Sequence, residues 1–337
     1  MNYVELHARS AFSFLEGASV PEELIAAAHE YGMPAMALLD RDGVYGAPRF
    51  HLAAQKNGIK AHIGAEITVS SFKFEVSGSK SPHVFSIPLL VRTRAGYQNL
   101  CRLITLMKLR VPKHAKPGEC AVTPIELAAY AEGLVCLTGG DDGPLSLRDG
   151  EARGRGAMEK MQSTVAWLLD VFGKGNVYAE LQRHFNRQEE ARNQAIVAVA
   201  RRLGLPLLAT NGVCQATVAR REVADVFTCL RNHVRLETAG QLLAKNSERY
   251  LKPAKTIAGL FADLPEAIAN TLELSSRLEF TLEDLGYEFP KYPVPAGETM
   301  ASFLRQRTAE GARERYTGKS GKPRYEHAWK QIERELT

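Results

Sequence analysis

The chain has 337 residues, of which 45% are hydrophobic and 24% charged, a balance that is ordinary for a soluble globular protein with a large core. Its longest apolar runs, such as 133–137 and 203–209, are strand-sized and fall well short of the roughly 20 residues that a membrane helix needs. The first residues lack a basic-then-apolar leader with a small-residue cleavage site. We therefore expect a cytoplasmic protein with no membrane partner.

The five cysteines are odd in number, widely spaced and without a Cys-x-x-Cys pair. This pattern favours reduced thiols over a disulfide framework or a zinc knuckle. The net charge of +5 is weakly basic. Affinity for nucleic acid follows clustered charge rather than the total, so this value by itself neither predicts nor excludes DNA binding.

Apolar runs of strand length alternate along the chain with amphipathic stretches at helical spacing. We predict strands at 3–8, 35–39, 61–69, 84–91, 133–137, 176–181 and 205–209. Alternation of this kind is typical of parallel strands joined by helical crossovers. About seven such units favour a barrel over an open sheet.

Helices are expected between the strands. Pro21, followed by Glu22 and Glu23, predicts the start of the first one, since proline suits the first turn and acids suit the positive end of the helix dipole. Residues 94–107 and 188–203 carry apolar residues at spacings of three and four. After residue 210 the strand pattern ceases, and helices are predicted at 220–231, 238–244, 253–261 and 265–278.

The stretch 285–298 is rich in proline and aromatic residues and predicts an extended connector at a domain boundary. A helix is expected at 299–316, then a turn rich in glycine and lysine at 317–323, and another helix from Tyr325. This last helix lacks a glycine or other C-cap. We therefore expect that the sequence continues beyond residue 337.

Polar side chains that can bind metal accompany three of the predicted strands. His7 and Glu16 lie in and after the first strand, Asp40 follows the second, and Glu66 lies in the third. Enzymes built on parallel strands gather their chemistry at strand ends. The sequence therefore contains a candidate metal site.

Several short strings occur in a distinctive order, at 3–7, 12–19, 96–103, 180–184, 208–211, 247–252 and 284–287. One of them is Phe12-Ser13-Phe14-Leu15-Glu16. Any one string is weak, but their succession is specific. On these strings the chain resembles the amino-terminal PHP (polymerase and histidinol phosphatase) domain of bacterial C-family DNA polymerases, the DNA polymerase III alpha-subunit type, and it is closest to their error-prone branch.

The resemblance implies an α/β fold: a distorted (β/α)7 barrel of the PHP type, a helical extension, and the start of a polymerase palm. We assign the barrel to 1–215, the extension to 216–285, and a linker with a truncated palm to 286–337. The parent reaction would be template-directed nucleotidyl transfer, in which two carboxylate-held Mg ions act in the palm. The family's palm carboxylates come later than residue 337, so we do not expect this chain to polymerise DNA alone.

Metal-bearing PHP domains hold two or three divalent ions on a ring of His, Asp, Glu and Cys side chains. By the resemblance, this chain keeps His7, Glu16 and Glu66 and offers Cys214 as a soft ligand. The degenerate ligand positions hold Arg9, Arg41, Ser86, Gly140 and Gly212. His83 lies three residues before the degenerate serine and compensates for it if the strand is shifted. A single Zn on His7, Glu66 and Cys214 is one alternative.

Arg9 and Arg41 are obligate cations, and they would supply positive charge where metal ions should bind. We therefore expect no multinuclear hydrolytic centre and no cofactor in this chain. The favoured hypothesis is that both arginines pair with Glu16, Asp40 or Glu66. Salt bridges would then replace metal crosslinks at the barrel mouth.

Basic residues between 92 and 116, with no acid before Glu119, could follow a phosphate backbone. The residues that we expect to contact DNA are Lys108, Arg110, Lys113 and Lys116. A solvated helix face and its loop is an equally good explanation of this charge. Asp141 and Asp142, in the glycine-rich stretch 139–143, are predicted to form a turn rather than a polymerase metal pair.

We therefore expect the amino-terminal PHP region of an error-prone DNA polymerase, with a structural role in DNA replication and damage-tolerant repair synthesis. Its partners would be DNA, bound weakly, and the rest of the polymerase or other translesion repair proteins. Two alternatives stay open. One is a metal-dependent phosphoesterase or 3'-5' exonuclease, and the other is a free-standing pseudoenzyme that binds DNA or repair proteins.

Overall fold

The structure is a computed structural model, and it describes residues 2–70, 84–112, 120–146, 155–283, 285, 291–316 and 322–336. The chain divides into two compact units, Met1–Glu283 and Asp284–Thr337. Each unit is described by itself. The predicted site residues Lys113 and Lys116, and also His83, lie outside the described residues.

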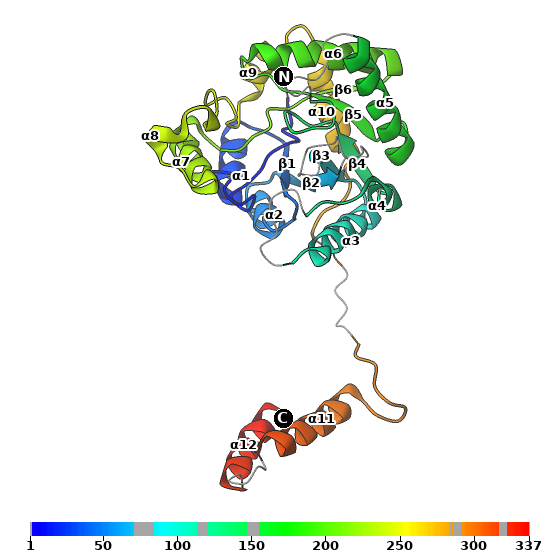
Figure 1. Cartoon of the computed structure of the whole chain (residues 1–337), viewed down its shortest axis with the longest axis vertical. Coiled ribbons are helices and arrows are strands. Elements are labelled where there is room, and N and C mark those ends of the chain that lie inside the picture. Colours follow the sequence, from blue (N-terminus) through cyan, green and yellow to red (C-terminus); the bar gives the residue numbers. More distant parts are fainter. Residues whose placement is uncertain are drawn as a thin grey trace, which may run out of the picture. The chain divides into compact units, whose positions relative to one another are not determined.

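The first unit is built on a curled sheet whose strands follow one another in chain order (Figure 1). The strands are β1 (Ala35–Arg41), β2 (Lys60–Ser70), β3 (Val84–Val91), β4 (Leu134–Leu137), β5 (Val177–Leu181) and β6 (Leu207–Ala209). Most pairs are parallel, but β3 runs antiparallel to both β2 and β4. The expectation of a wholly parallel sheet was therefore wrong at β3.

The segment before the first helix closes the curl, although it forms isolated bridges rather than the continuous strand predicted at 3–8. On one side, the N–H of Ala37 in β1 donates to the Glu5 carbonyl at 2.8 Å. On the other side, the Val213 N–H donates to the His7 carbonyl at 2.9 Å, and the Arg9 N–H donates to the Val213 carbonyl at 2.8 Å. The predicted α/β fold with a distorted barrel is thus confirmed, with six strands and one bridging segment.

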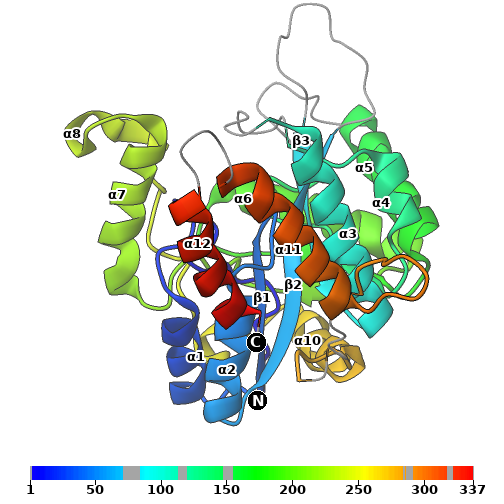
Figure 2. The same ribbon diagram turned by 90° about the horizontal axis from the view of Figure 1, so that it is seen from below.

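Helices surround the curled sheet, as Figures 1 and 2 show. Those of the barrel are α1 (Pro21–Glu30), α2 (Ala47–Lys56), α3 (Arg94–Arg110), α4 (Pro124–Ala129), α5 (Arg155–Phe172) and α6 (Arg187–Leu203). Helix α1 begins at Pro21 with two acids in its first turn, and α6 begins after Asn186, whose side chain accepts from the Gln188 N–H. The local signals in the sequence therefore set these boundaries.

The part of the first unit after β6 is helical. It contains η1 (Val218–Arg220), α7 (Arg221–Asn232), α8 (Leu236–Ala239), η2 (Gly240–Leu242), α9 (Ala254–Leu260) and α10 (Pro265–Arg277). Helix α10 packs against β6, where the Asn270 amide donates to the Leu207 carbonyl at 2.8 Å. Its Leu274 is fully buried in a cluster with Val4 and Leu6 from the start of the chain. The helical part therefore completes the core beneath the barrel-closing segment.

The second unit contains α11 (Met300–Tyr316) and α12 (Lys322–Glu335), which pack together. Arg305 of α11 pairs with Glu333 of α12 at 2.7 Å. Tyr292 stacks on Phe303 with ring centroids 6.2 Å apart. That this unit is the beginning of a polymerase palm stays a prediction.

Across the described parts of both units, none of the helices combines the length and the apolar character needed to cross a membrane.

Candidate functional site: the barrel mouth

The predicted site residues come together at one end of the barrel, which we call the barrel mouth. His7 and Arg9 lie on the closing segment, Arg41 ends β1, Glu66 lies in β2 and Glu180 lies in β5. All five are largely buried, since the side chains of His7, Glu66 and Glu180 are at most 4% exposed and those of Arg9 and Arg41 are 16% and 18% exposed. The charged groups of this cluster therefore interact mainly with one another rather than with solvent.

His7 lies between two carboxylates. Its Nδ1 is 2.6 Å from Glu180 Oε1, and its Nε2 is 3.3 Å from Glu66 Oε2. A neutral imidazole has one N–H and could donate to only one of these carboxylates, so the geometry favours the imidazolium. Burial by itself lowers the pKa of His7, but Glu180 and then Glu66 outweigh it and raise the pKa to about 10.

Glu66 is the centre of the ion-pair network. Its Oε2 accepts from Arg9 Nε at 2.6 Å, and its Oε1 lies 3.3 Å from Arg41 Nη1. Burial would raise the pKa of this carboxyl, but Arg9 and Arg41 together with His7 hold it well below its usual range. A buried carboxylate with these partners is firmly ionised.

Glu16 links the same two arginines at the rim of the mouth. Its Oε2 lies 3.4 Å from Arg9 Nη1 and 3.2 Å from Arg41 Nε, and Arg231 of α7 approaches its Oε1 at 3.5 Å. Arg41 also donates to the Ser86 hydroxyl of β3. The hydroxyl at the degenerate position Ser86 thus accepts from a guanidinium.

Of the three carboxylates considered as arginine partners, Asp40 is held by serines among the described residues. Its Oδ1 accepts from the Ser10 N–H at 2.8 Å, from the Ser10 hydroxyl at 2.9 Å and from the Ser13 hydroxyl at 2.8 Å. Burial raises the pKa of Asp40, and these hydrogen bonds oppose that rise. The carboxylate orders the loop after the closing segment.

These residues do not fit a metal ion. Both guanidiniums direct N–H groups at the carboxylates that a cation would need. Within the described ranges, no three His, Cys, Asp or Glu side chains are grouped as a metal site requires. Cys214 Sγ lies 3.5 Å from the Gly212 carbonyl, and among the described residues it belongs to no group of three such side chains.

The degenerate positions Gly140 and Gly212 leave room for two other side chains. A Cβ on Gly140 would lie 2.6 Å from Gln182 Oε1. A Cβ on Gly212 would lie 2.7 Å from Gln182 Nε2 and 2.8 Å from Arg249 Nη1. Gln182 and Arg249 therefore fill the second half of the mouth.

Sequence reasoning missed these roles. Gln182 and Arg249 stand in strings that carry the family resemblance, but no local pattern shows that they meet. Arg192 of α6 was also missed, and it reaches Asp141 at the same side of the mouth. Contacts between residues 51 apart, as for Arg192 and Asp141, or 67 apart, as for Arg249 and Gln182, have no signature in a single sequence.

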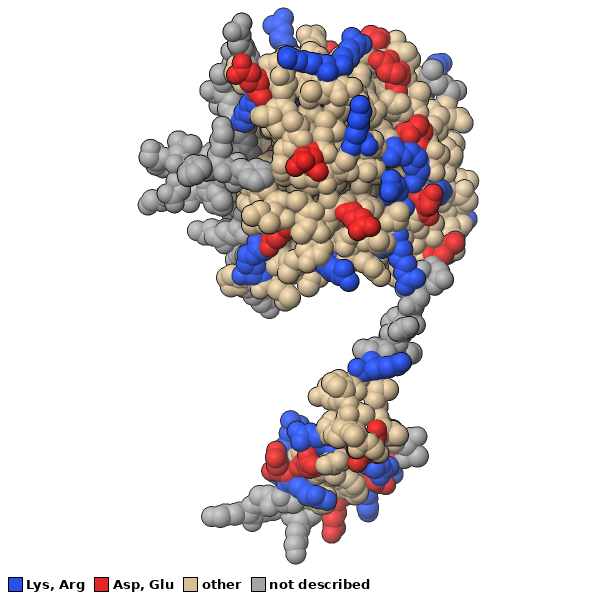
Figure 3. All heavy atoms as spheres, turned by 90° about the vertical axis from the view of Figure 1, so that its right-hand side faces the viewer, with Lys and Arg blue, Asp and Glu red and all other residues tan. Residues whose placement is uncertain are grey.

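The predicted DNA-contact residues are only partly described. Lys108 and Arg110 lie at the exposed end of α3. Arg110 pairs with Glu126 and donates to the Ala121 carbonyl at 3.2 Å, so its charge is already engaged. Figure 3 shows acidic and basic side chains interspersed over one face of the first unit rather than a continuous basic stripe. DNA contact by these residues stays a prediction.

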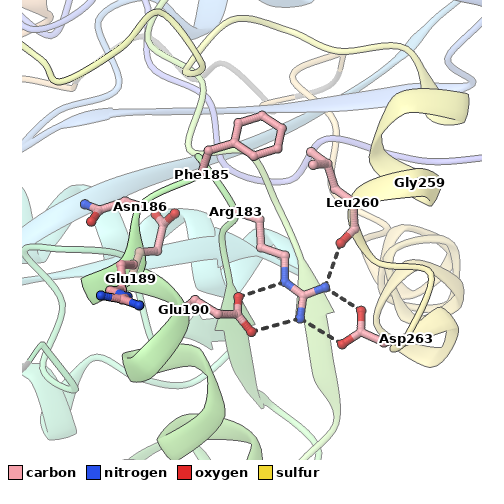
Figure 4. Close-up of a pocket in the computed structure, with 9 residues that line it drawn as sticks. Arg183, Phe185, Asn186, Glu189, Glu190, Gly259, Leu260 and Asp263 are labelled. Carbon is pink, nitrogen blue, oxygen red and sulfur yellow. Dashed lines mark hydrogen bonds and ion pairs between the residues drawn. The ribbon is translucent and has the colours of Figure 1, made fainter.

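A separate hollow of about 650 Å³ lies between the loop after β5 and the turn from α9 to α10 (Figure 4). Arg183 crosses it, with Asp263 Oδ2 at 2.9 Å, the Leu260 carbonyl at 2.6 Å and Glu190 Oε2 at 3.2 Å. Phe185, at a φ of 57°, stands 77% exposed at its edge. Because the guanidinium already has partners on several sides, we interpret Arg183 as a structural link between the barrel and the helices that follow it.

Comparison with known proteins identifies the class. Residues 5–184 match the family model described as PHP domain, and the chain belongs to this family. It is 35% identical over 335 residues to the error-prone DNA polymerase of Mycolicibacterium paratuberculosis, covering 99% of this chain and 30% of that protein. It is also 35% identical over 334 residues to error-prone DNA polymerase 1 of Rhizobium meliloti, covering 99% of this chain and 27% of that protein.

The chain therefore spans about 30% of the length of the curated relatives that it matches. Among solved structures, an amidohydrolase from Chromobacterium violaceum aligns with a TM-score of 0.40 at 14% identity, covering 63% of this chain and 88% of that one.

Proposed function

We propose that this chain is the PHP portion of an error-prone DNA polymerase and that its barrel mouth is a structural centre held by ion pairs instead of metal. The observation that carries the proposal is the Glu66 carboxylate, which receives Arg9, Arg41 and His7 at once. The relatives named error-prone DNA polymerase support the polymerase context. In that context the chain would act in the cytoplasm, in replication and damage-tolerant repair synthesis, with DNA and the rest of the polymerase as partners.

The alternative of a phosphoesterase or 3'-5' exonuclease would need clustered ligands, and the described residues offer none. Changing Arg9 and Arg41 to histidine would not restore such a centre, because Gly140 and Gly212 still supply no donor. We therefore expect no metal-dependent nuclease activity in R9H/R41H. The free-standing pseudoenzyme has no observation of its own in its favour.

The test is the response of the fold to chelation and to loss of the central carboxylate. The thermal midpoint of the chain should be the same with and without EDTA, because metal does not couple to folding here. Glu66→Gln should destabilise the chain by roughly 3–5 kcal/mol, since it leaves two buried guanidiniums short of their partner. The measurement is urea or thermal denaturation followed by circular dichroism.

Glu22→Gln is the matched control. Glu22 is 43% exposed and pairs with Arg49 on the surface at 2.6 Å, so its loss should cost at most about 1 kcal/mol. A fall of the thermal midpoint with EDTA, together with zinc in the purified protein, would contradict the structural proposal. A primer-extension assay with Mg should also give no product with this chain alone.

A further inference from the structure

Two arginines from distant parts of the chain bind one carboxylate on the side of the mouth that Gln182 and Arg249 fill. Arg192 of α6 donates through Nη1 to Asp141 Oδ1, and Arg249 donates through Nη2 to Oδ2 at 2.7 Å. Each oxygen of the carboxylate thus has its own guanidinium. Paired guanidiniums around a planar or tetrahedral oxyanion are the arrangement by which proteins bind carboxylate and phosphate groups.

The arginine side of this contact is fixed. The Arg192 side chain is only 8% exposed, and its Nε is buried without a hydrogen-bond partner among the described residues. Its Nη2 lies 3.8 Å from Glu189, which is itself engaged by the His184 ring at 2.7 Å. Leaving such a donor unsatisfied is costly, so this guanidinium is not fully compensated by its present partners.

Arg249 is held in place by a chain of polar contacts. Its Nη1 donates to Gln182 Oε1 at 3.2 Å, and Gln182 Nε2 donates to Glu180 Oε1 at 2.8 Å. The absence of side chains at Gly140 and Gly212 gives Gln182 and Arg249 this space. The guanidinium is therefore positioned by the barrel and not by Asp141 alone.

The carboxylate side, by contrast, is open to solvent. The Asp141 side chain is 55% exposed and sits on the turn after β4. That turn has its own anchors, since Gly143 donates to the Gly140 carbonyl at 3.1 Å and Ser86 donates to the Asp142 carbonyl at 2.8 Å. Rotation of the Asp141 side chain would expose both guanidiniums without moving the backbone.

We propose that Arg192 and Arg249 form an oxyanion site for a phosphate group, with Gln182 as a positioning residue and Asp141 as an internal carboxylate that fills the site when no phosphate is bound. A phosphate dianion carries more charge than the carboxylate and has oxygens for both guanidiniums. Binding needs no metal and does not rest on the polymerase assignment. Asp141 competes with the ligand and so lowers its apparent affinity.

The test measures phosphate binding by isothermal titration calorimetry at constant ionic strength. Asp141→Asn removes the competing charge at constant size. It should tighten the binding of inorganic phosphate by about tenfold or more, because the form in which residue 141 occupies the two arginines no longer predominates. Arg249→Gln in the same background should abolish the gain. Asp142→Asn is the matched control, because this neighbouring acid pairs with Arg41 and not with the proposed site.

The outcomes are distinct. Equal affinities of parent and D141N, or an equal gain in D142N, would overturn the proposal, since the first denies competition and the second reduces the effect to net charge. If D141N does not fold, the proposal is tested on the parent chain by thermal denaturation. Phosphate should then raise its thermal midpoint above that in chloride of equal ionic strength, and Arg249→Gln should remove the difference; no difference in the parent overturns the proposal.

Short oligonucleotides distinguish a phosphate at a nucleic-acid end from free phosphate as the ligand. Tighter binding of an oligonucleotide with a terminal phosphate than of the same oligonucleotide without it, lost in Arg249→Gln, would assign the site to a nucleic-acid end. Binding of inorganic phosphate alone would assign it to a free phosphate. Equal binding of both oligonucleotides, unaffected by Arg249→Gln, with no response to inorganic phosphate would contradict the site. The chelation test of the structural proposal is unaffected by any of these results.

Discussion

At the scale of single residues, His7 carries the charge that a metal ion would otherwise supply. It meets Glu180 through Nδ1 and Glu66 through Nε2, both buried. Of the two contacts the one to Glu180 is shorter, and Glu180 is also held by Gln182 at 2.8 Å and by the Thr210 hydroxyl. The imidazolium therefore depends first on Glu180.

This dependence predicts how stability varies with pH. The pKa of His7 is raised to about 10 in the fold, above the value of about 6.5 for an unfolded histidine. The stabilisation is therefore fully present below about pH 6.5 and is lost as the pH rises towards 10. Glu180→Gln keeps a hydrogen-bonding group but removes the charge, so we expect the pKa of His7 to fall and this loss with pH to shrink.

The measurement is the histidine ring chemical shift by NMR, with the free energy of unfolding measured from pH 6 to 10. Glu5, whose burial raises the pKa of its carboxyl to about 7, changes stability in the same direction at the low end of this range. The difference between parent and variant is thus decisive, rather than the parent curve alone. His29→Gln, at an exposed histidine of α1, should leave the curve unchanged. A His7 pKa near 6.5 in the parent would refute the imidazolium.

At the scale of elements, glycines shape the mouth because they lack a side chain. Gly212 has a φ of 50°, and its Cβ would enter the space of Gln182 and Arg249. Gly212→Ala should therefore combine backbone strain of about 1–2 kcal/mol with displacement of the two side chains. We expect a larger loss of stability than backbone strain alone would give.

Gly204→Ala provides the comparison. Gly204 ends α6 in the left-handed conformation, with φ 69° and ψ 36°, and nothing lies within 4 Å of its Cβ position. Its substitution should cost only the backbone strain of about 1–2 kcal/mol. Urea denaturation of both variants measures the difference, and equal losses would show that the space around Gly212 is not limiting.

The same scale shows what the sequence could predict. Periodicity and capping residues located the strands and helices because they act locally, as at Pro21 and at the start of α6. They did not reveal that β3 is antiparallel, since a buried strand has the same apolar pattern in either direction. The resemblance placed Arg9 and Arg41 near the carboxylates Glu16, Asp40 and Glu66, and in the structure both arginines lie on Glu66 and Glu16.

Site residues that meet through the fold were beyond sequence reasoning. Asp40 was one of three carboxylates considered as arginine partners, and the sequence did not show that Ser10 and Ser13 lie close enough in the folded loop to donate to its oxygens. The convergence of Arg192 and Arg249 on Asp141 joins three separate segments. Only the closed barrel places such groups side by side.

At the scale of the whole molecule, the barrel and the helices that follow it share one core. The Thr271 hydroxyl of α10 accepts from the Val4 N–H at 3.3 Å, and Asn270 donates to β6. The compact unit accordingly runs to Glu283 and not to the end of the sheet. The proposed barrel of 1–215 and extension of 216–285 would then be parts of one folding unit.

Two truncations test this unit. A chain that ends after Glu283 keeps α10 and should have a thermal midpoint within about 2 °C of the 337-residue chain, a difference below roughly 1 kcal/mol for a domain of this size. A chain that ends after Asp263 loses α10, and with it the buried Leu274 and the partners of Val4 and Leu207. It should fail to fold cooperatively, because the removed side chains leave the barrel-closing segment uncovered. If the chain ending after Asp263 instead unfolded at the parent temperature, the helical part would be an independent extension, and the barrel would have to hold its closing segment by the ion pairs of the mouth alone.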